Sequence, residues 1–256
     1  MCESCGCSGG IDHFHVSGSI VRPAASGEVK VMRSLLRENG HQAAHNRAHF
    51  DAVHVLAINL MSSPGAGKTS LLEATIRALG ARLSIAVIEG DLETENDARR
   101  IRAAGAPAVQ ITTGNACHLD ASMVHAALHQ VDLSSIDVLF IENVGNLVCP
   151  AAFDLGQHHN VVLLSVTEGD DKPEKYPVMF RAADLMAITK VDLMTAVDDF
   201  DPALAKRHLR ELANAAPVLE LSARSGMGLG SWIDWIIDEA ASRRRFRTAH
   251  HGTAHG

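Results

Sequence analysis

The stretch SSPGAGKTS, residues 62–70, decides the fold that this sequence predicts. A short apolar run, VLAINLM (residues 55–61), precedes it, and SLLEATIRAL (residues 70–79) follows with its apolar residues at helical spacing. A strand, a glycine-rich loop, Gly-Lys-Thr and a helix occur in this order in phosphate-binding P-loops. The stretch therefore predicts a nucleotide-binding site, and an ordinary strand–turn–helix is the alternative.

The residues of this loop have separate expected roles. Gly65 and Gly67 allow backbone N–H groups to surround phosphate oxygens, and the start of the helix adds a partial positive charge. Lys68 is expected to reach the β- and γ-phosphates, and the Thr69 hydroxyl to bind Mg²⁺. Ser62 stands where the generic pattern has its first glycine. The remaining loop residues expected to contact the nucleotide are Ser63, Ala66 and Ser70.

Composition narrows the class of protein. Of the 256 residues, 46% are apolar and 21% charged, as in ordinary globular proteins, and the net charge of −7 argues against a nucleic-acid partner. No apolar run approaches the about 18 residues of a membrane span, and no signal peptide is recognised at the start. We expect a cytoplasmic protein without a membrane partner. The five cysteines are then expected to be thiols or metal ligands rather than disulfides.

Apolar runs alternate with helical patterns over most of the chain, which predicts an α/β fold with a mostly parallel sheet and helices on both faces. Residues 1–28 are expected to form a flexible arm and linker, with residues 20–29 as linker or edge strand. Residues 29–248 are expected to form the P-loop domain, led by a helix over 29–51 that is broken near Gly40. A disordered histidine tail is expected at 249–256. The predicted strands are 54–60, 83–88, 108–112, 138–142, 161–166, 185–188 and 218–221, and the predicted helices 68–79, 96–104, 121–129, 202–213 and 231–243.

The tetrapeptide TKVD, residues 189–192, indicates that the base is guanine. Asp192 would accept hydrogen bonds from the N1–H and 2-amino groups, which adenine lacks, while the Lys190 stem packs on the base. Ser222 and Ala223 follow about one strand later and would offer backbone contacts to the guanine carbonyl. Thr189 replaces the usual Asn, and we expect this change to weaken the tie between this loop and the P-loop. The pair of motifs disfavours a small-molecule kinase.

Two carboxylates end predicted strands beside the P-loop. Asp91 and Glu142 are placed to hold Mg²⁺ directly or through water, and a helix cap is the alternative role for Asp91. Gly145 could donate its backbone N–H to the γ-phosphate, so that this loop senses the nucleotide. No glutamine stands where it would orient the attacking water, so intrinsic hydrolysis should be slow.

The cysteines fall in two groups. Cys2, Cys5 and Cys7 form a CxxCxC pattern in the arm, where an exposed cluster has no packing role and metal binding is expected. The pair Cys117-His118 and the later Cys149 each follow a predicted strand, so parallel strands would bring them to the nucleotide edge. Thiolates with an imidazole suit tetrahedral Zn²⁺ or planar Ni²⁺. Small buried apolar cysteines are the alternative.

With these motifs the chain resembles the HypB family, the hydrogenase nickel-insertion GTPases of the SIMIBI class. The matching pieces cover most of residues 50–195 in the same order, together with the arm. They are MCESCGC, NLMSSPGAGKTSLL, EGD followed by ENDARRI, TTGNACHLDA, ENVGNLVCPAAFDLG, VTEGDDKPEKYPVMF and TKVDL. The related urease-accessory GTPases usually carry Cys-Pro-His, whereas Cys149-Pro150 is followed here by Ala151.

The resemblance implies a GTPase that binds GTP or GDP with Mg²⁺, forms a homodimer when GTP is bound, and delivers nickel. Its implied partners are a nickel-delivery protein and the precursor of the [NiFe]-hydrogenase large subunit. The arm, here Cys2, Cys5 and Cys7, would form a tight nickel site. The domain set, here Cys117, His118 and Cys149, would form a weaker site for nickel or zinc near the dimer interface.

Two alternatives stay open: a urease-type accessory GTPase, and a nickel-storage protein whose GTPase is vestigial.

Other features have simpler interpretations. His41, His45 and His49 share one helix face, which permits metal binding but favours a solvated surface. Lys172 and Lys175 lie on the nucleotide edge, where they would be solvated or touch nucleotide from a partner subunit. The basic run 242–247 is expected to cap the end of a helix.

Overall fold

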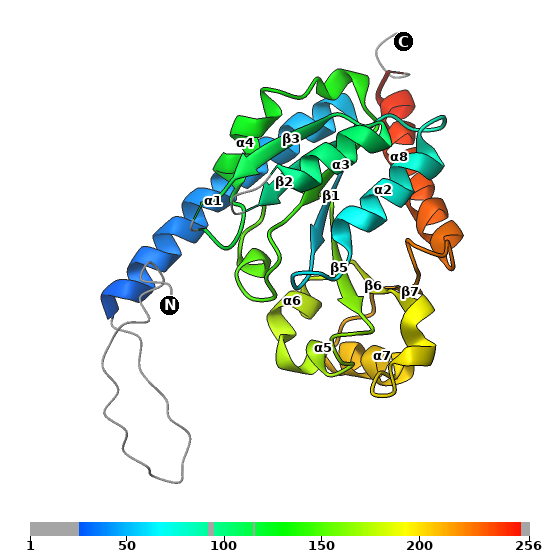
Figure 1. Cartoon of the computed structure of the whole chain (residues 1–256). Coiled ribbons are helices and arrows are strands. Elements are labelled where there is room, and N and C mark those ends of the chain that lie inside the picture. The colour runs from blue at the N-terminus through cyan, green and yellow to red at the C-terminus, as the bar shows by residue number, and fades with distance from the viewer. Residues whose placement is uncertain (1–25, 92–94, 115, 252–256) are drawn as a thin grey trace.

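The computed structural model describes residues 26–91, 95–114 and 116–251, and the arm cysteines therefore lie outside the described residues. Its centre is a parallel sheet of seven strands in the order β3-β2-β4-β1-β5-β6-β7 (Figure 1). The predicted α/β class is confirmed. The strands are β1 Leu56–Met61, β2 Ile85–Asp91, β3 Ala108–Thr112, β4 Val138–Glu142, β5 His159–Ser165, β6 Leu185–Thr189 and β7 Val218–Glu220.

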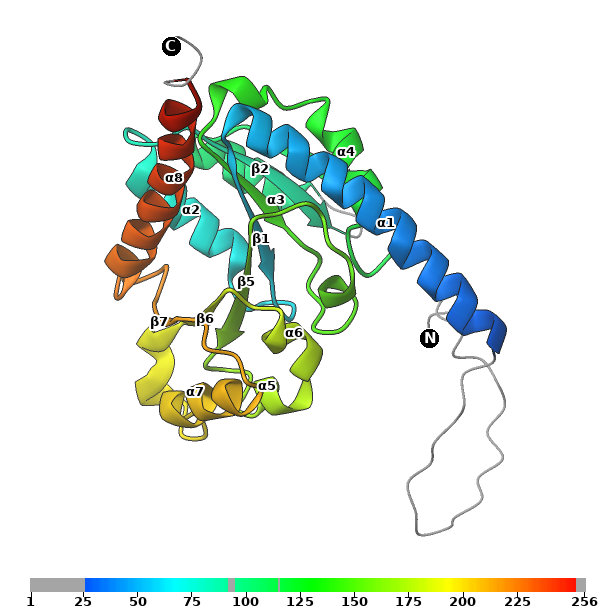
Figure 2. The ribbon, with the colours of Figure 1, turned by 180° about the vertical axis from the view of Figure 1, so that it is seen from behind.

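Helices cover both faces of the sheet. Helices α1 and α4 lie side by side on one face, and α2, α3 and α8 cover the other (Figures 1 and 2). The helices are α1 Ser26–Val53, α2 Lys68–Leu79, α3 Asn96–Ala104, α4 Ala121–Leu128, α5 Lys172–Lys175, α6 Pro177–Arg181, α7 Pro202–Glu211 and α8 Leu229–His251. Short 3₁₀ turns are η2 Leu133–Ser135, η3 Pro150–Ala152 and η4 Val191–Ala196. In the part of the chain that the structure describes, no helix combines the length and apolarity that a bilayer crossing requires.

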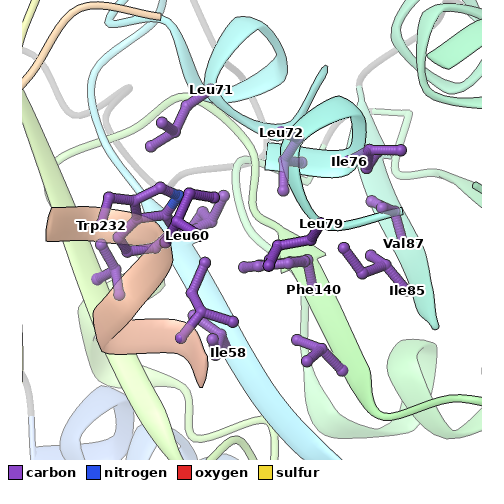
Figure 3. Close-up of a cluster of buried hydrophobic side chains, with 14 of the residues drawn as sticks. Ile58, Leu60, Leu71, Leu72, Ile76, Leu79, Ile85, Val87, Phe140 and Trp232 are labelled. Carbon is purple, nitrogen blue, oxygen red and sulfur yellow. The ribbon is translucent and has the colours of Figure 1, made fainter. Parts of the chain in front are cut away.

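The core beneath α2 and α8 fixes the helix that follows the P-loop. Trp232 of α8 is fully buried among Leu60, Leu72 and Phe140, as Figure 3 shows. Its indole Nε1 donates a hydrogen bond of 2.8 Å to Thr75 Oγ1 of α2. Burial of side chains of this size contributes roughly 1.5–3 kcal/mol each, so α2 is held firmly against the sheet.

Helix α1 differs from the sequence prediction, because it begins at Ser26 and continues through Gly40 without a break. Buried asparagines anchor it on both sides of the glycine. Asn39 Nδ2 donates to Asp154 O at 2.7 Å, and Asn46 Nδ2 donates to Leu155 O at 3.1 Å. A glycine inside a helix costs only about 1 kcal/mol relative to alanine, so these tertiary contacts prevail.

One glycine lets α1 approach the loop below it. Gly156 has a φ of +90°, and a Cβ there would lie 2.6 Å from Ala43 O. Only a residue without a side chain fits this approach, in this backbone conformation. The carbonyl of Gly156 in turn accepts a hydrogen bond of 2.7 Å from Arg47 Nε.

The C-terminal helix also differs from the prediction. Helix α8 runs to His251, whereas the predicted helix ends at residue 243. The basic run 242–247 therefore lies inside the helix instead of capping its end, and residues 249–251 of the predicted disordered tail are helical. Basic side chains are favoured near the end of a helix, but they do not themselves end its backbone hydrogen bonding. The basic run therefore does not fix the last residue of α8.

Candidate functional site

The P-loop joins β1 to α2 and borders a cavity of about 520 Å³ at the carboxyl edge of the sheet. Gly65 and Gly67 have φ angles of +78° and +100°, which L side chains rarely adopt. Lys68 is buried, and its Nζ lies 3.1 Å from Ser62 Oγ, so Ser62 positions the lysine although it replaces a glycine. The predicted residues lining this cavity are Gly65, Gly67, Lys68, Thr69, Ser70, Asp91, Glu142, Gly145 and Lys190. Ser63 does not line it.

Acidic side chains face the P-loop across this cavity. Thr69 Oγ1 donates a hydrogen bond of 2.8 Å to Glu142 Oε1. Glu89, Asp97 and Glu142 each offer an oxygen within 4.8 Å of the others. The second oxygens of Glu89 and Glu142 are buried without a hydrogen-bond partner.

Burial raises the pKa of Glu89 to about 8, with added repulsion from Glu142 and Asp91. It also raises the pKa of Glu142 to about 7, against the opposing effects of Lys68 and the Thr69 hydrogen bond. A hard divalent cation would supply the missing charge and partners, so these oxygens fit Mg²⁺.

Glu89 and Asp97 were not singled out as metal ligands from the sequence. Glu89 lies opposite Glu142 in the register of β2 and β4, which places the two carboxylates side by side. Asp97 lies in the first turn of α3. Asp91, which was singled out, borders the same cavity, and Glu95 occupies the N-cap of α3.

A second, more apolar cavity of about 190 Å³ adjoins the first. Thr189 Oγ1 donates a hydrogen bond of 2.7 Å to Ala66 O, and Lys190 Nζ donates one of 2.7 Å to Gly65 O. Thr189 therefore ties this loop to the P-loop through its hydroxyl, in the place of the usual Asn. The predicted guanine contacts Asp192, Ser222 and Ala223 line this cavity together with Ala66 and Lys190.

The structure brings the three domain cysteine and histidine residues together. Cys117 Sγ lies 2.9 Å from Cys149 Sγ and 3.8 Å from His118 Nδ1. His118 stacks on Phe153 with ring centroids 3.9 Å apart, and all three candidate ligands are half-buried. Burial and the contact with Cys149 raise the pKa of Cys117, and burial lowers the pKa of His118. The predicted convergence of two thiols and an imidazole is therefore present.

This cluster is joined to the phosphate cavity by one short loop. Gly145 packs against the P-loop so closely that a Cβ there would lie 2.8 Å from Pro64 Cα. Further along, Asn146 Oδ1 accepts hydrogen bonds from Val148 N at 2.7 Å and Cys149 N at 3.3 Å. Gly145 and Cys149 are thus four residues apart on a loop that Asn146 braces.

The two lysines do not join the site in this chain. Lys175 forms an ion pair with Asp171, and Lys172 Nζ lies 5.8 Å from the ring centroid of Tyr176. Neither lines the two cavities.

Residues 56–220 match the family model described as the CobW/HypB/UreG nucleotide-binding domain. A hydrogenase maturation factor HypB from Azotobacter vinelandii is 53% identical over 219 residues, covering 86% of this chain and 72% of that protein. The chain belongs to the HypB family. A crystal structure of HypB from Helicobacter pylori in complex with nickel has a TM-score of 0.76 and 39% identity, covering 80% of this chain and 96% of that one. A hydrogenase/urease maturation factor HypB from Helicobacter hepaticus is 41% identical, covering 87% of this chain and 91% of that protein.

Membership of the HypB family accounts for the main features of the site. The matched residues contain the P-loop, the phosphate cavity and the Cys117–His118–Cys149 cluster. Ser222 and Ala223 of the second cavity lie just beyond them. The chain is thus a HypB-type maturation factor with a nucleotide-binding P-loop domain, as its resemblance predicted.

Proposed function

We propose that this chain is a GTP-hydrolysing metallochaperone that binds Ni²⁺ and helps to insert it into the precursor of the [NiFe]-hydrogenase large subunit. The observation that carries the proposal is the loop from Glu142 to Cys149. One end of this loop borders the phosphate cavity, and the other contributes a thiol to the Cys117–His118–Cys149 cluster. Because one short loop borders both sites, a change in its conformation on nucleotide binding would also change the metal site.

GTP is the nucleotide that the second cavity favours. Asp192 borders it with a carboxylate that would accept two hydrogen bonds from guanine. Lys68 would bind the β- and γ-phosphates, and the N–H of Gly145 would donate to the γ-phosphate. Thr69, Asp91 and Glu142 would hold Mg²⁺, which neutralises phosphate charge when bound. We expect slow intrinsic hydrolysis to GDP.

The cysteine-containing sites are assigned to nickel. Ni²⁺ is the cargo of the Cys117–His118–Cys149 cluster, and Zn²⁺ suits the same ligands. The nickel complex of the H. pylori relative supports the choice of Ni²⁺. Cys2, Cys5 and Cys7 would form a second, tighter nickel site. The protein would act in the cytoplasm as a GTP-favoured homodimer, with a nickel-delivery protein as a further partner.

Nucleotide and metal would be coupled in both directions. GTP binding draws Gly145 toward the γ-phosphate, and the same movement changes the position of Cys149. If GTP changes the affinity for metal by some factor, metal must change the affinity for GTP by the same factor.

The decisive experiment is an equilibrium Ni²⁺ titration of the full chain under reducing conditions, with GDP or a non-hydrolysable GTP analogue. The proposal expects a tight site that disappears in a Cys2→Ser/Cys5→Ser/Cys7→Ser variant and a weaker site that disappears in Cys149→Ser. It also expects the weaker site to differ in affinity between the two nucleotides. Equal affinities with both nucleotides would contradict the coupling.

Turnover and client complete the test. GTP hydrolysis with a preference over ATP is expected, and absence of hydrolysis at every metal load would favour a nickel-storage protein. The H. hepaticus relative is a hydrogenase/urease maturation factor, so urease is a second client class. Co-purification with a hydrogenase large-subunit precursor, compared with a urease subunit, distinguishes the two.

A further inference from the structure

Three histidines from two helices meet on the face of the molecule that α1 and α4 cover. His45 and His49 lie one turn apart on α1, and His125 lies on α4. Each offers a ring nitrogen within 4.8 Å of the others. The ring centroid of His45 lies 4.6 Å from that of His49 and 5.0 Å from that of His125. The spacing on α1 was visible in the sequence, but the third histidine was not.

A buried asparagine fixes how His125 is presented. Asn46 is fully buried, and its Nδ2 donates to the carbonyl oxygens of Ala121 at 2.8 Å and Leu155 at 3.1 Å. Because carbonyl oxygens only accept, these contacts leave Oδ1 as the Asn46 atom that lies 3.0 Å from His125 Nδ1. His125 Nδ1 must therefore carry the proton, and the lone pair of Nε2 is left for a ligand.

This arrangement is the one that metal-binding histidines use. A ligating imidazole normally donates its other N–H to an oxygen, which sets the tautomer and the ring orientation. Among the described residues, none of the three histidines forms an ion pair with a carboxylate.

The helices that carry the ligands are held in place. Asn39 Oδ1 accepts a hydrogen bond of 2.8 Å from Ala121 N, at the start of α4, and Asn46 bonds the carbonyl of the same residue. His45 and His49 are exposed and free to rotate, apart from a long contact of 3.4 Å between His45 Nδ1 and Gln42 Nε2. Ligand nitrogens on a tetrahedral ion lie about 3.3 Å apart, a separation that small side-chain rotations reach from here.

We propose that His45, His49 and His125 bind one divalent transition-metal ion, Ni²⁺ or Zn²⁺, at a site separate from the cysteine cluster. An all-imidazole set suits these borderline ions and disfavours Mg²⁺ or Ca²⁺. Water completes the coordination, or His129, whose ring centroid lies 5.0 Å from that of His125. The site needs neither nucleotide nor thiols, so it stands independently of the proposed GTPase activity.

A metal here would link two parts of the molecule. Helix α4 begins at Ala121, three residues after His118, so His125 is carried by the element that leads away from the cysteine cluster. An ion bound across the helices would tie that element to α1 and raise the stability of the folded chain.

The test uses the full chain with its thiols alkylated and with Mg²⁺ in excess. Added Ni²⁺ or Zn²⁺ then meets blocked thiols, and Mg²⁺ competes for the carboxylates of Glu89, Asp97 and Glu142. Wild type is compared with His45→Gln/His49→Gln and with the matched control His41→Gln, an exposed histidine one turn earlier on α1. Equal melting temperatures without metal establish that all three proteins fold. Equilibrium dialysis should show the double variant binding at least about tenfold more weakly at one site, while His41→Gln equals wild type.

A second readout assigns the site. In wild type, the ring ¹⁵N signal of His125 Nε2 should shift with the first equivalent of Zn²⁺, and in the double variant it should stay unshifted. Equal binding by the double variant and the control, or a His125 signal that Zn²⁺ leaves unshifted in wild type, would overturn the proposal. Histidines elsewhere in the chain are present in all three proteins and do not affect the comparison.

Discussion

The nucleotide edge of the sheet and the α1 seam differ in whether their buried polar groups have hydrogen-bond partners. We define the α1 seam as Asn39, Asn46 and His158 with their hydrogen-bond partners. Each of these side chains is paired: Asn39 and Asn46 bond backbone groups of facing segments, and His158 Nδ1 accepts from Ala57 N at 2.9 Å. At the nucleotide edge, Glu89 and Glu142 each keep one buried oxygen without a partner.

This difference separates structural polar groups from functional ones. A buried polar group without a partner destabilises the fold, so it persists where a ligand completes it. The nucleotide edge is therefore expected to gain stability when Mg²⁺ and nucleotide bind, whereas the α1 seam is already complete. Substitutions should lower activity at the edge and stability at the seam.

The largest effect is expected for Glu142→Gln. Removing the charge that faces the Mg²⁺ position should reduce GTP hydrolysis by about 100-fold or more, measured as phosphate release. The ligand-free protein should melt at the same temperature or higher at pH 8, because burial raises the pKa of Glu142 to about 7 and disfavours its ionised form. Undiminished turnover, or a clear loss of stability, would place Glu142 with the structural groups.

An intermediate effect is expected for Asn46→Ala in the seam. Two buried carbonyls and the N–H of His125 would lose their partner, which should lower the free energy of unfolding by about 2–3 kcal/mol in urea denaturation. GDP affinity should stay the same. The control is Glu38→Ala, an exposed position two turns earlier on α1, which should change stability by about 0.5 kcal/mol or less. A loss of GDP affinity without a loss of stability would contradict a purely structural role for Asn46.

The smallest effect is a pH dependence at the seam. Burial lowers the pKa of His158 to about 4, although its Nε2 lies 3.0 Å from Asp51 Oδ1. An unfolded histidine titrates near 6.5, so between these values the unfolded chain holds the extra proton and stability falls as pH falls. At pH 5.5 this should remove about 1 kcal/mol.

The measurement is the melting temperature of wild type and His158→Gln between pH 7.5 and 4.5. The lowered pKa of Asp51 acts in the same direction, since its carboxylate also loses its stabilising contacts when protonated. The variant should therefore show a shallower decline with acid than wild type. Parallel curves for the two proteins would show that His158 is not the titrating group.

The sequence predicted local elements well where the signal was local. The helices at Lys68–Leu79 and Asn96–Ala104 have the predicted bounds, because a P-loop and a glycine after Ala104 mark their ends. The predicted break at Gly40 was wrong, since contacts of Asn39 and Asn46 with distant segments outweigh one glycine. Local propensity does not contain such contacts.

Site residues divide along the same line. Lys68, Thr69 and the Cys117–His118–Cys149 set follow from motifs and from the order of parallel strands. Glu89 and His125 do not, because each gains its meaning from a partner brought near by the register of strands or the packing of helices. Thr189 shows a third case, in which the residue was noticed but the reach of its hydroxyl to Ala66 was visible only in three dimensions.

The two tryptophans of α8 provide an intrinsic fluorescence probe. The chain has two tryptophans, and Trp232 and Trp235 stack with ring centroids 5.4 Å apart. One of them is hydrogen-bonded to Thr75, two turns along the helix that starts at the P-loop lysine. Emission excited at the red edge of the indole band should therefore report the state of that helix, so loading with nucleotide can be followed without attaching a dye.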